Sequence, residues 1–237
     1  MTGIAGRLNW DDDSSYLEII GSEGDKTVLV EGQGTVQNTA RTCGPQLSCW
    51  REGSVSVAVY TTGSETENLA KLVATQYLSS PESLKSYHES TLSLALIDSD
   101  KGKVFLSVDL FARFPLYFCQ DSSGIRFSSS SIALTKAVEA PIEGSIEGNS
   151  TTQINPQSVF HYLYFHMVPT PHSIYQNVQA VESSHIIEIS KGQLSKQLIP
   201  GLADMRVNKA SPNDSQRLRD RLAASVEKKR LNVRLRF

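Results

Sequence analysis

The second residue of the chain has the side chain most suited to covalent chemistry. The sequence opens Met1-Thr2-Gly3, and an initiator methionine in front of a small residue is normally removable. Its removal would leave Thr2 with a free α-amine beside its own hydroxyl, and a threonine hydroxyl activated by that amine is an established type of nucleophile. Thr2 is therefore a candidate catalytic residue, provided that the fold supplies an oxyanion hole and substrate contacts.

Other residues that could do chemistry are sparse. His161 and His166 lie five apart on an expected helix, so their side chains point to poorly aligned faces and a metal pair is not expected. The three cysteines, Cys43, Cys49 and Cys119, form no CxxC pair. This pattern argues against a zinc site or a disulfide framework and favours a reduced, cytoplasmic protein. No metal and no cofactor are expected.

Composition excludes several functional classes. Hydrophobic residues make up 39% and charged residues 20% of the 237 residues, and the net charge is −2. These values allow a packed core and give no sign of a general nucleic-acid binder. No apolar run is long enough for an export signal or a membrane span. Basic residues crowd 217–230, where they predict a solvated helix face rather than an RNA-binding surface.

Short strands and turns dominate the first two thirds of the chain. Residues 92–98 and 104–110 alternate in polarity on either side of the turn-forming sequence DSDKGK, which predicts a hairpin. The same signals predict a strand at 55–60, a hairpin pairing 115–118 with 125–127, and a last hairpin that begins with the strand 185–189.

Three helices are expected. Apolar spacing predicts helices over 65–77 and 216–231, and Asn155-Pro156 opens the third, because proline suits the first helical position. The aromatic residues of this third helix are predicted to face the core; they are Phe160, Tyr162, Tyr164 and Phe165.

The central hairpins carry a family resemblance. Residues 104–118 (VFLSVDLFARFPLYF) and 124–134 (GIRFSSSSIAL) resemble the asparagine synthetase family, in which a strand ends in Asp-Arg-x-Gly-x-x-Pro-Leu-Tyr-Tyr and a Phe-Ala-Ser-Glu segment follows. The matching residues are Asp109, Pro115, Leu116, Tyr117, Phe127, Ser129, Ala133 and Leu134. Residues 162–181 resemble the family's Tyr-Leu-x-Phe segment with its two prolines, and residues 3–6 (GIAG) match its Cys-Gly-Ile-x-Gly opening.

The resemblance implies the fold and the domain division. The family begins with a class II glutamine amidotransferase domain, an α+β N-terminal-nucleophile fold that is a four-layer αββα sandwich of antiparallel sheets. Residues 1–200 are expected to form this domain, and residues 201–237 a linker and the first helix of a truncated asparagine synthetase-like domain. No Ser-Gly-Gly-x-Asp-Ser nucleotide loop occurs in the chain. The apolar face of the last helix is expected either to be exposed or to be covered by a protein partner, such as a separate synthetase chain.

The resemblance also implies site residues, and this chain departs from most of them. Thr2 stands where the family has its cysteine nucleophile. The arginine that holds the glutamine carboxylate precedes Leu-Ser in the family, and Arg41 is the nearest candidate before Leu47-Ser48. No asparagine for the oxyanion hole occurs between residues 55 and 67, and Glu89-Ser90 replaces the Asp-Gly that contacts the substrate amine.

Two functional hypotheses follow. In the first, the domain does not hydrolyse glutamine and acts as a scaffold or interaction domain. In the second, Thr2 hydrolyses glutamine or another small amide. The loss of one oxyanion donor alone typically costs about 10²–10³ in rate, and several contacts are altered together here, which favours the first hypothesis.

Overall fold

The chain forms two compact units in a computed structural model. The first comprises Met1–Ala203 and the second Asp204–Phe237. The structure describes residues 3–11, 15–20, 26–28, 34–38, 46–61, 69–86, 92–136, 153–191, 193–198 and 213–234.

An antiparallel sheet built around the first strand forms one layer of the first unit. In the described part of the chain it has six strands in the order β11-β9-β10-β1-β2-β3. Their bounds are β1 Gly3–Asn9, β2 Ser15–Ile20, β3 Lys26–Val28, β9 Tyr117–Gln120, β10 Gly124–Ser128 and β11 Gln179–Ala180. β1 therefore lies between β2, its neighbour in sequence, and β10, which comes more than a hundred residues later.

A second antiparallel sheet collects the expected hairpins. Its described strands follow the order β13-β12-β8-β7-β6-β5-β4. Their bounds are β4 Gly34–Asn38, β5 Gln46–Glu52, β6 Val55–Thr61, β7 Leu92–Asp98, β8 Lys103–Ser107, β12 His185–Ser190 and β13 Gln193–Leu198. The strand predicted at 104–110 ends earlier than expected, because the chain turns at 109–112, where the Ala112 N–H donates to the Asp109 carbonyl.

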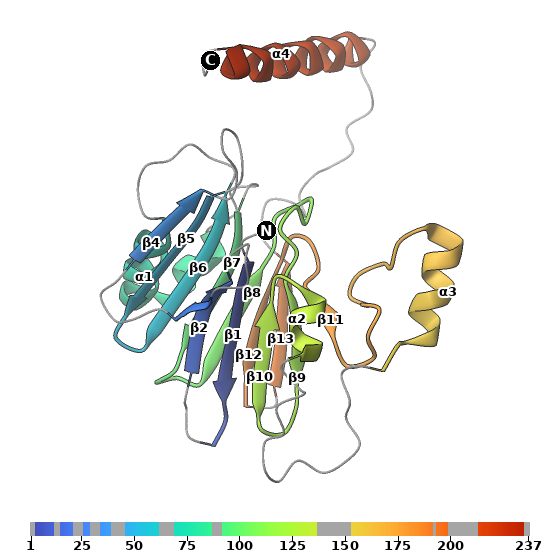
Figure 1. Ribbon diagram of the computed structural model, residues 1–237. Coiled ribbons are helices and arrows are strands. Elements are labelled where there is room, and N and C mark those ends of the chain that lie inside the picture. Colours follow the sequence, from blue (N-terminus) through green and yellow to red (C-terminus); the bar gives the residue numbers. More distant parts are fainter. Residues whose placement is uncertain are drawn as a thin grey trace. The chain divides into compact units, whose positions relative to one another are not determined.

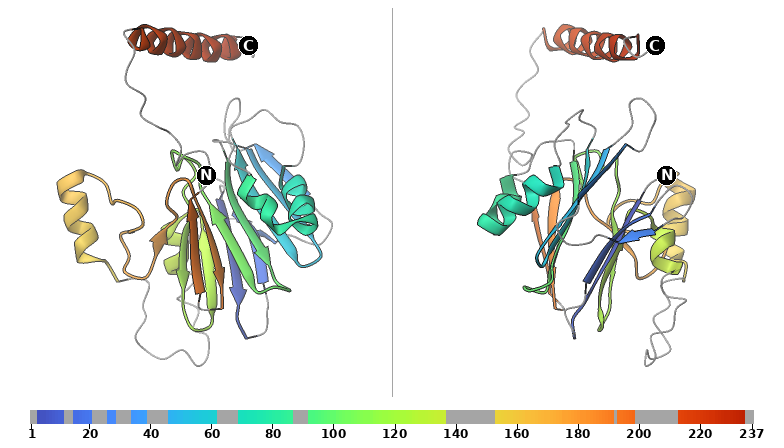
Figure 2. Two further views of the ribbon diagram at one scale, coloured as in Figure 1. Left: turned by 180° about the vertical axis from the view of Figure 1, so that it is seen from behind. Right: turned by 60° about the vertical axis from the view of Figure 1, so that its left-hand side comes forward.

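The two sheets face one another across the main hydrophobic core (Figure 2). Alternate residues of each strand point into it: Ile4 and Leu8 from β1 lie opposite Ala58 and Tyr60 from β6. The other face of β6 presents Val55, Val57 and Val59 to a separate core. A strand buried on both faces explains why VSVAVYT contains so few polar residues.

Helices cover the outer faces of both sheets. The helix α1 (Leu69–Ser79) packs Ala70, Val73 and Tyr77 against the outer face of the second sheet, next to the 3₁₀ helix η1 (Pro81–Ser86). The short helix α2 (Ser131–Lys136) covers β9 through Leu134 and Cys119. The layer order is therefore α1, second sheet, first sheet, α2. The expected α+β fold of two antiparallel sheets is confirmed, and it is consistent with an N-terminal-nucleophile architecture.

The helix α3 (Pro156–Phe165) begins as predicted but contradicts the expected direction of its aromatic face. Asn155 is its N-cap and accepts a hydrogen bond from the Gln157 N–H, and His166 ends it in a left-handed conformation. Figure 1 shows α3 standing away from both sheets. Its aromatic residues are 54–71% exposed (Phe160, Tyr162, Tyr164 and Phe165), so the prediction that they face the core was wrong. A periodic apolar pattern indicates that a helix has an apolar face but not which molecule covers it.

The second unit contains the helix α4 (Asp214–Arg234), which includes the range 216–231 expected from sequence. Leu218, Leu222 and Val226 are 58–66% exposed. The apolar face expected on this helix is therefore solvent-accessible within its own unit.

Candidate functional site at the start of the first strand

The start of β1 is held by two serines at the end of β10: Ser128, its last residue, and Ser129, which follows it. The Ile4 N–H donates to Ser129 Oγ at 3.1 Å, and the Ile4 carbonyl accepts from the Ser128 hydroxyl at 2.9 Å and the Ser129 N–H at 3.0 Å. Ser128 is completely buried. The serine run 128–131, which belongs to the segment that carries the family resemblance, thus fixes the start of β1 within the first sheet through its first two residues.

Tyr60 reaches Ser129 from the opposite sheet. Its side chain hydrogen-bonds Ser129, and its ring stacks on Phe114 with centroids 5.3 Å apart and planes 16° apart. Burial raises the pKa of the Tyr60 hydroxyl to about 12, although the Ser129 hydrogen bond opposes the shift. The hydroxyl is therefore neutral at physiological pH. The space between the sheets next to the start of β1 is occupied by an aromatic pair.

The loop that carries Phe114 is organised by a buried carboxylate. Asp109 accepts hydrogen bonds from the Arg113 N–H at 2.8 Å and from Arg113 Nε at 2.6 Å. Its own N–H lies 3.4 Å from the hydroxyl of buried Ser93. Both carboxylate oxygens are therefore used to shape the loop. The glycine of the family motif is Ala112 in this chain, and Ala112 has a φ of 45°, the left-handed conformation that glycine adopts most easily.

The described residues include no activated thiol. Cys49 lies on β5 in the core between the sheets, where burial raises the pKa of its thiol to about 12. Burial also raises the pKa of the Cys119 thiol. Burial thus disfavours the thiolate, which is the nucleophilic form, at both residues. Neither Cys49 nor Cys119 is therefore a candidate nucleophile.

The residues proposed from sequence are not placed by the structure. Thr2, Arg41 and Glu89 lie outside the described residues. The Leu47-Ser48 pair does lie within them: Leu47 is fully buried between the sheets, and the Ser48 hydroxyl accepts a hydrogen bond from the Ala70 N–H of α1. Ser48 therefore joins α1 to the second sheet, while Leu47 points into the core between the sheets.

Sequence reasoning missed the group formed by Tyr60, Phe114, Ser128 and Ser129. These residues come from three segments, and only the serine run stands out in the sequence. Their contact depends on the stacking of two sheets, which no local pattern reveals. Among the described ranges, no cluster of three or more His, Cys, Asp or Glu side chains could hold a metal ion.

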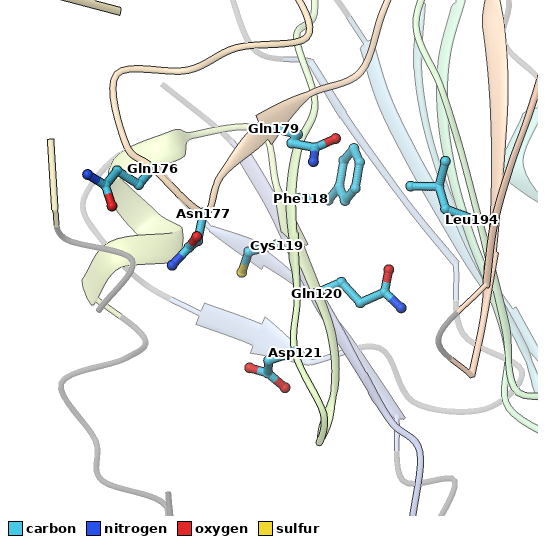
Figure 3. A pocket seen from close by; sticks show the side chains of 8 residues that line it. All are labelled: Phe118, Cys119, Gln120, Asp121, Gln176, Asn177, Gln179 and Leu194. Atoms are coloured by element: carbon cyan, nitrogen blue, oxygen red, sulfur yellow. The ribbon is translucent and has the colours of Figure 1, made fainter. Parts of the chain in front are cut away.

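A separate polar pocket of about 420 Å³ lies along β9. Figure 3 shows the amides of Gln120 and Gln179 on the neighbouring strands β9 and β11, with Gln176 and Asn177 beside them. The carboxylate of Asp121 at its rim already accepts from Ser123, Gly124 and Arg126. The lining includes none of the residues that surround the start of β1. None of the helices that the structure describes is both long and apolar enough to cross a membrane.

Comparison with known proteins places the chain in a family. A family model described as a glutamine amidotransferase domain matches residues 52–198, which is more than half of the chain. A search of curated proteins found no match. The matched region extends from the end of β5 to the end of β13 and includes the Asp109 loop and the serine run, whereas β1 precedes it. The chain belongs to the glutamine amidotransferase domain family.

Proposed function

We propose that this chain is an asparagine synthetase-like protein whose glutamine amidotransferase domain does not hydrolyse glutamine and acts as a scaffold or interaction domain. The main support is that the polar side chains at the start of β1 are hydrogen-bonded to the protein itself. Ser128 and Ser129 bond the Ile4 main chain, and Tyr60 bonds Ser129. These side chains are therefore engaged within the protein itself.

The sequence supports the same conclusion through four positions. Thr2 replaces the cysteine nucleophile, the arginine before Leu-Ser is displaced to Arg41, residues 55–67 lack an asparagine, and Glu89 replaces the aspartate that contacts the substrate amine. One missing oxyanion donor costs about 10²–10³ in rate. The combined departures favour a domain retained for its shape.

A second candidate function is an amidohydrolase that uses Thr2 on glutamine or another small amide, releasing ammonia for asparagine synthesis or a related amidation. One observation favours it: β1 keeps the family's Gly-Ile-x-Gly pattern and lies between β2 and β10 in regular register.

Two measurements on the full chain separate these functions. Intact-mass spectrometry determines whether Met1 is removed, because only a free Thr2 amine can serve as the base. A glutaminase assay that follows ammonia release then compares the wild type with Thr2→Ala. Equal background rates support the scaffold. A wild-type rate at least about tenfold above that of Thr2→Ala, with Met1 removed, overturns it.

Thr2→Cys adds a sharper comparison. Cysteine is intrinsically the stronger nucleophile, so an otherwise intact site would gain activity. We expect no gain, because the binding groups have changed as well as the nucleophile. Activity in Thr2→Cys alone would show that the substrate contacts remain and that only the nucleophile has been lost.

The domain division is part of this proposal. Residues 1–200 are assigned to the amidotransferase-like domain and 201–237 to a linker and the first helix of a synthetase-like domain. The exposed residues Leu218, Leu222 and Val226 on α4 support a protein partner there, such as a separate synthetase chain in the cytoplasm. Titration of the full chain with such a synthetase, compared with Leu222→Asp, tests the contact: equal affinity of both forms counts against it.

A further inference from the structure

Two buried polar atoms on one side of α3 have no hydrogen-bond partner among the described residues. Ser158 is completely buried, and its hydroxyl is unpartnered. His161, three residues further along the helix, has a buried Nδ1 that is also unpartnered. Residues three apart on a helix are neighbours on its surface. Because buried polar groups nearly always have a partner, two unpartnered ones side by side point to a bound water or ion.

A second imidazole lies next to His161. The ring centroids of His161 and His172 are 5.8 Å apart, and the ring planes are inclined at 47°. Metal–nitrogen bonds of about 2.0–2.1 Å place two imidazoles on one tetrahedral ion with their centroids roughly 5–6 Å apart. The observed separation therefore suits two ligands of the same ion. The sequence offered only His166 as a partner for His161, whereas the tertiary structure brings His172 to it from the segment that follows the helix.

Gln157 determines which nitrogen of His161 is available. Its Nε2 lies 2.9 Å from His161 Nε2. The terminal amide of Gln157 can turn over, so that its oxygen accepts the hydrogen of Nε2. His161 Nδ1 then presents a lone pair on the buried side of the helix. Histidines that bind a metal usually donate their other N–H to an oxygen in this way, which fixes the orientation of the ring.

The donor atoms select the class of ion. Residues 148–181 contain no Asp, Glu, Lys or Arg. This segment therefore supplies no carboxylate that would compete for the imidazoles and no basic side chain that would repel a cation. Imidazole nitrogen suits Zn²⁺, Cu²⁺ and Ni²⁺, whereas Mg²⁺ and Ca²⁺ require oxygen ligands. The chemistry of the group fits a divalent transition-metal ion.

Independent main-chain contacts hold the two imidazoles. Asn155 caps α3, and its own N–H donates to the Ile174 carbonyl at 2.9 Å. The His172 N–H donates to the Pro169 carbonyl at 3.1 Å, and His172 forms an antiparallel bridge with Gln179. Both histidines are thus positioned before any ion binds, and ligands that are already ordered lose less entropy on binding.

We propose that His161 Nδ1 and His172 bind a divalent transition-metal ion that fastens α3 to the segment following it. Water completes the coordination, and the Ser158 hydroxyl hydrogen-bonds that water. Within the described residues no group of three or more His, Cys, Asp or Glu side chains could hold a metal. Two imidazoles bind more weakly than the four ligands of a structural zinc centre, so we expect a dissociation constant of roughly 10 μM for Zn²⁺ and a lower one for Cu²⁺. The inference goes beyond the proposed function and does not depend on whether glutamine is hydrolysed.

Isothermal titration of the full chain with Zn²⁺, and separately with Cu²⁺, tests the site. His161→Gln and His172→Asn are each expected to raise the dissociation constant by at least about tenfold, because each removes a ligand. Gln157→Ala should raise it by about tenfold while leaving both ligands in place, because it removes the group that orients the His161 ring. Electron paramagnetic resonance of the Cu²⁺ form should show nitrogen coordination in the wild type that is lost when both histidines are replaced.

A matched variant makes the test specific. His166→Asn changes the exposed histidine that ends α3 and should leave the affinity for both ions unchanged. Circular dichroism checks the fold; if His161→Gln is not folded, His172→Asn, which changes an exposed side chain, carries the test. Absence of saturable binding of either ion below about 1 mM overturns the proposal. Binding that is undiminished in the folded His161 and His172 variants, or that His166→Asn abolishes, is adventitious and also overturns it.

Discussion

Replacing Gly6 with alanine should disrupt the first sheet next to the candidate site. Gly6 lies in the middle of β1 and pairs with Phe127 of β10. The Phe127 ring is fully buried and lies across the Gly6 backbone. A Cβ atom on residue 6 would lie 2.3 Å from Phe127 Cζ and 2.7 Å from Cε1. Carbon atoms are in favourable contact at about 3.5–4.0 Å, so the ring would have to move by more than about 1 Å in a packed core.

The expected cost follows from two opposing effects. Overpacking a core typically costs about 1–3 kcal/mol. Alanine is favoured over glycine within a strand by about 0.5–1 kcal/mol, which offsets part of this cost. We expect Gly6→Ala to lower the free energy of unfolding by about 1–2 kcal/mol. With a urea dependence of about 1–3 kcal/mol per molar, the midpoint should fall by roughly 0.5–1 M.

Tryptophan fluorescence during urea unfolding provides the measurement, since Trp10 lies in the core between the sheets and Trp50 packs against the core under α1. Gly53→Ala is a contrasting variant: no atom lies within 4 Å of its Cβ position, so any loss there comes from its φ of 57° alone and should persist unchanged in a Phe127→Leu background. In a Phe127→Leu background the clash is relieved, and Gly6→Ala should cost less than about 0.5 kcal/mol. A wild-type midpoint for Gly6→Ala, or an undiminished loss in the Phe127→Leu background, would refute the steric explanation.

Three further predictions concern loop strain, a buried hydrogen bond and acid stability. Ala112→Gly should raise the free energy of unfolding, measured in urea, by about 0.5 kcal/mol. The left-handed φ of 45° costs alanine about 1–2 kcal/mol, and the greater freedom of glycine in the unfolded chain offsets part of the strain that is relieved. A lower free energy of unfolding in the variant would contradict this prediction. Tyr77→Phe should cost about 2 kcal/mol in the same assay, since the buried Tyr77 hydroxyl donates to Asp98 Oδ2 at 2.8 Å, and an unchanged midpoint would show that this bond contributes nothing. Burial by itself would raise the pKa of Asp98. Hydrogen bonds from Lys101 and Tyr77 lower the pKa by more than burial raises it, so the net pKa of Asp98 lies below its ordinary value. The stabilising contribution of Asp98 is therefore fully present above about pH 5 and is lost as the pH falls through its folded-state pKa. As the pH is lowered, the urea midpoint should fall less steeply for Asp98→Asn than for the wild type. Parallel curves for the two proteins would refute this prediction.

Local sequence patterns determined much of the secondary structure. The predicted pairing of residues 92–98 with 104–110 is observed as β7 and β8, and Asn155-Pro156 caps and begins α3 as expected. Strand alternation, turn residues and helix caps act over a few residues, so they can be read without knowing the fold. The family resemblance added the two-sheet architecture, which composition and periodicity alone do not specify.

Only the tertiary structure decided which groups meet. The contact of Tyr60 with Ser129 and the position of the Phe127 ring over Gly6 join segments distant in sequence. The outward direction of the aromatic residues of α3 depends on what covers a surface. An apolar residue is stabilised by burial against any suitable surface, whether in its own chain or in a partner. Sequence periodicity therefore identified the apolar faces of this protein, and the packing of the two sheets determined which of them became core.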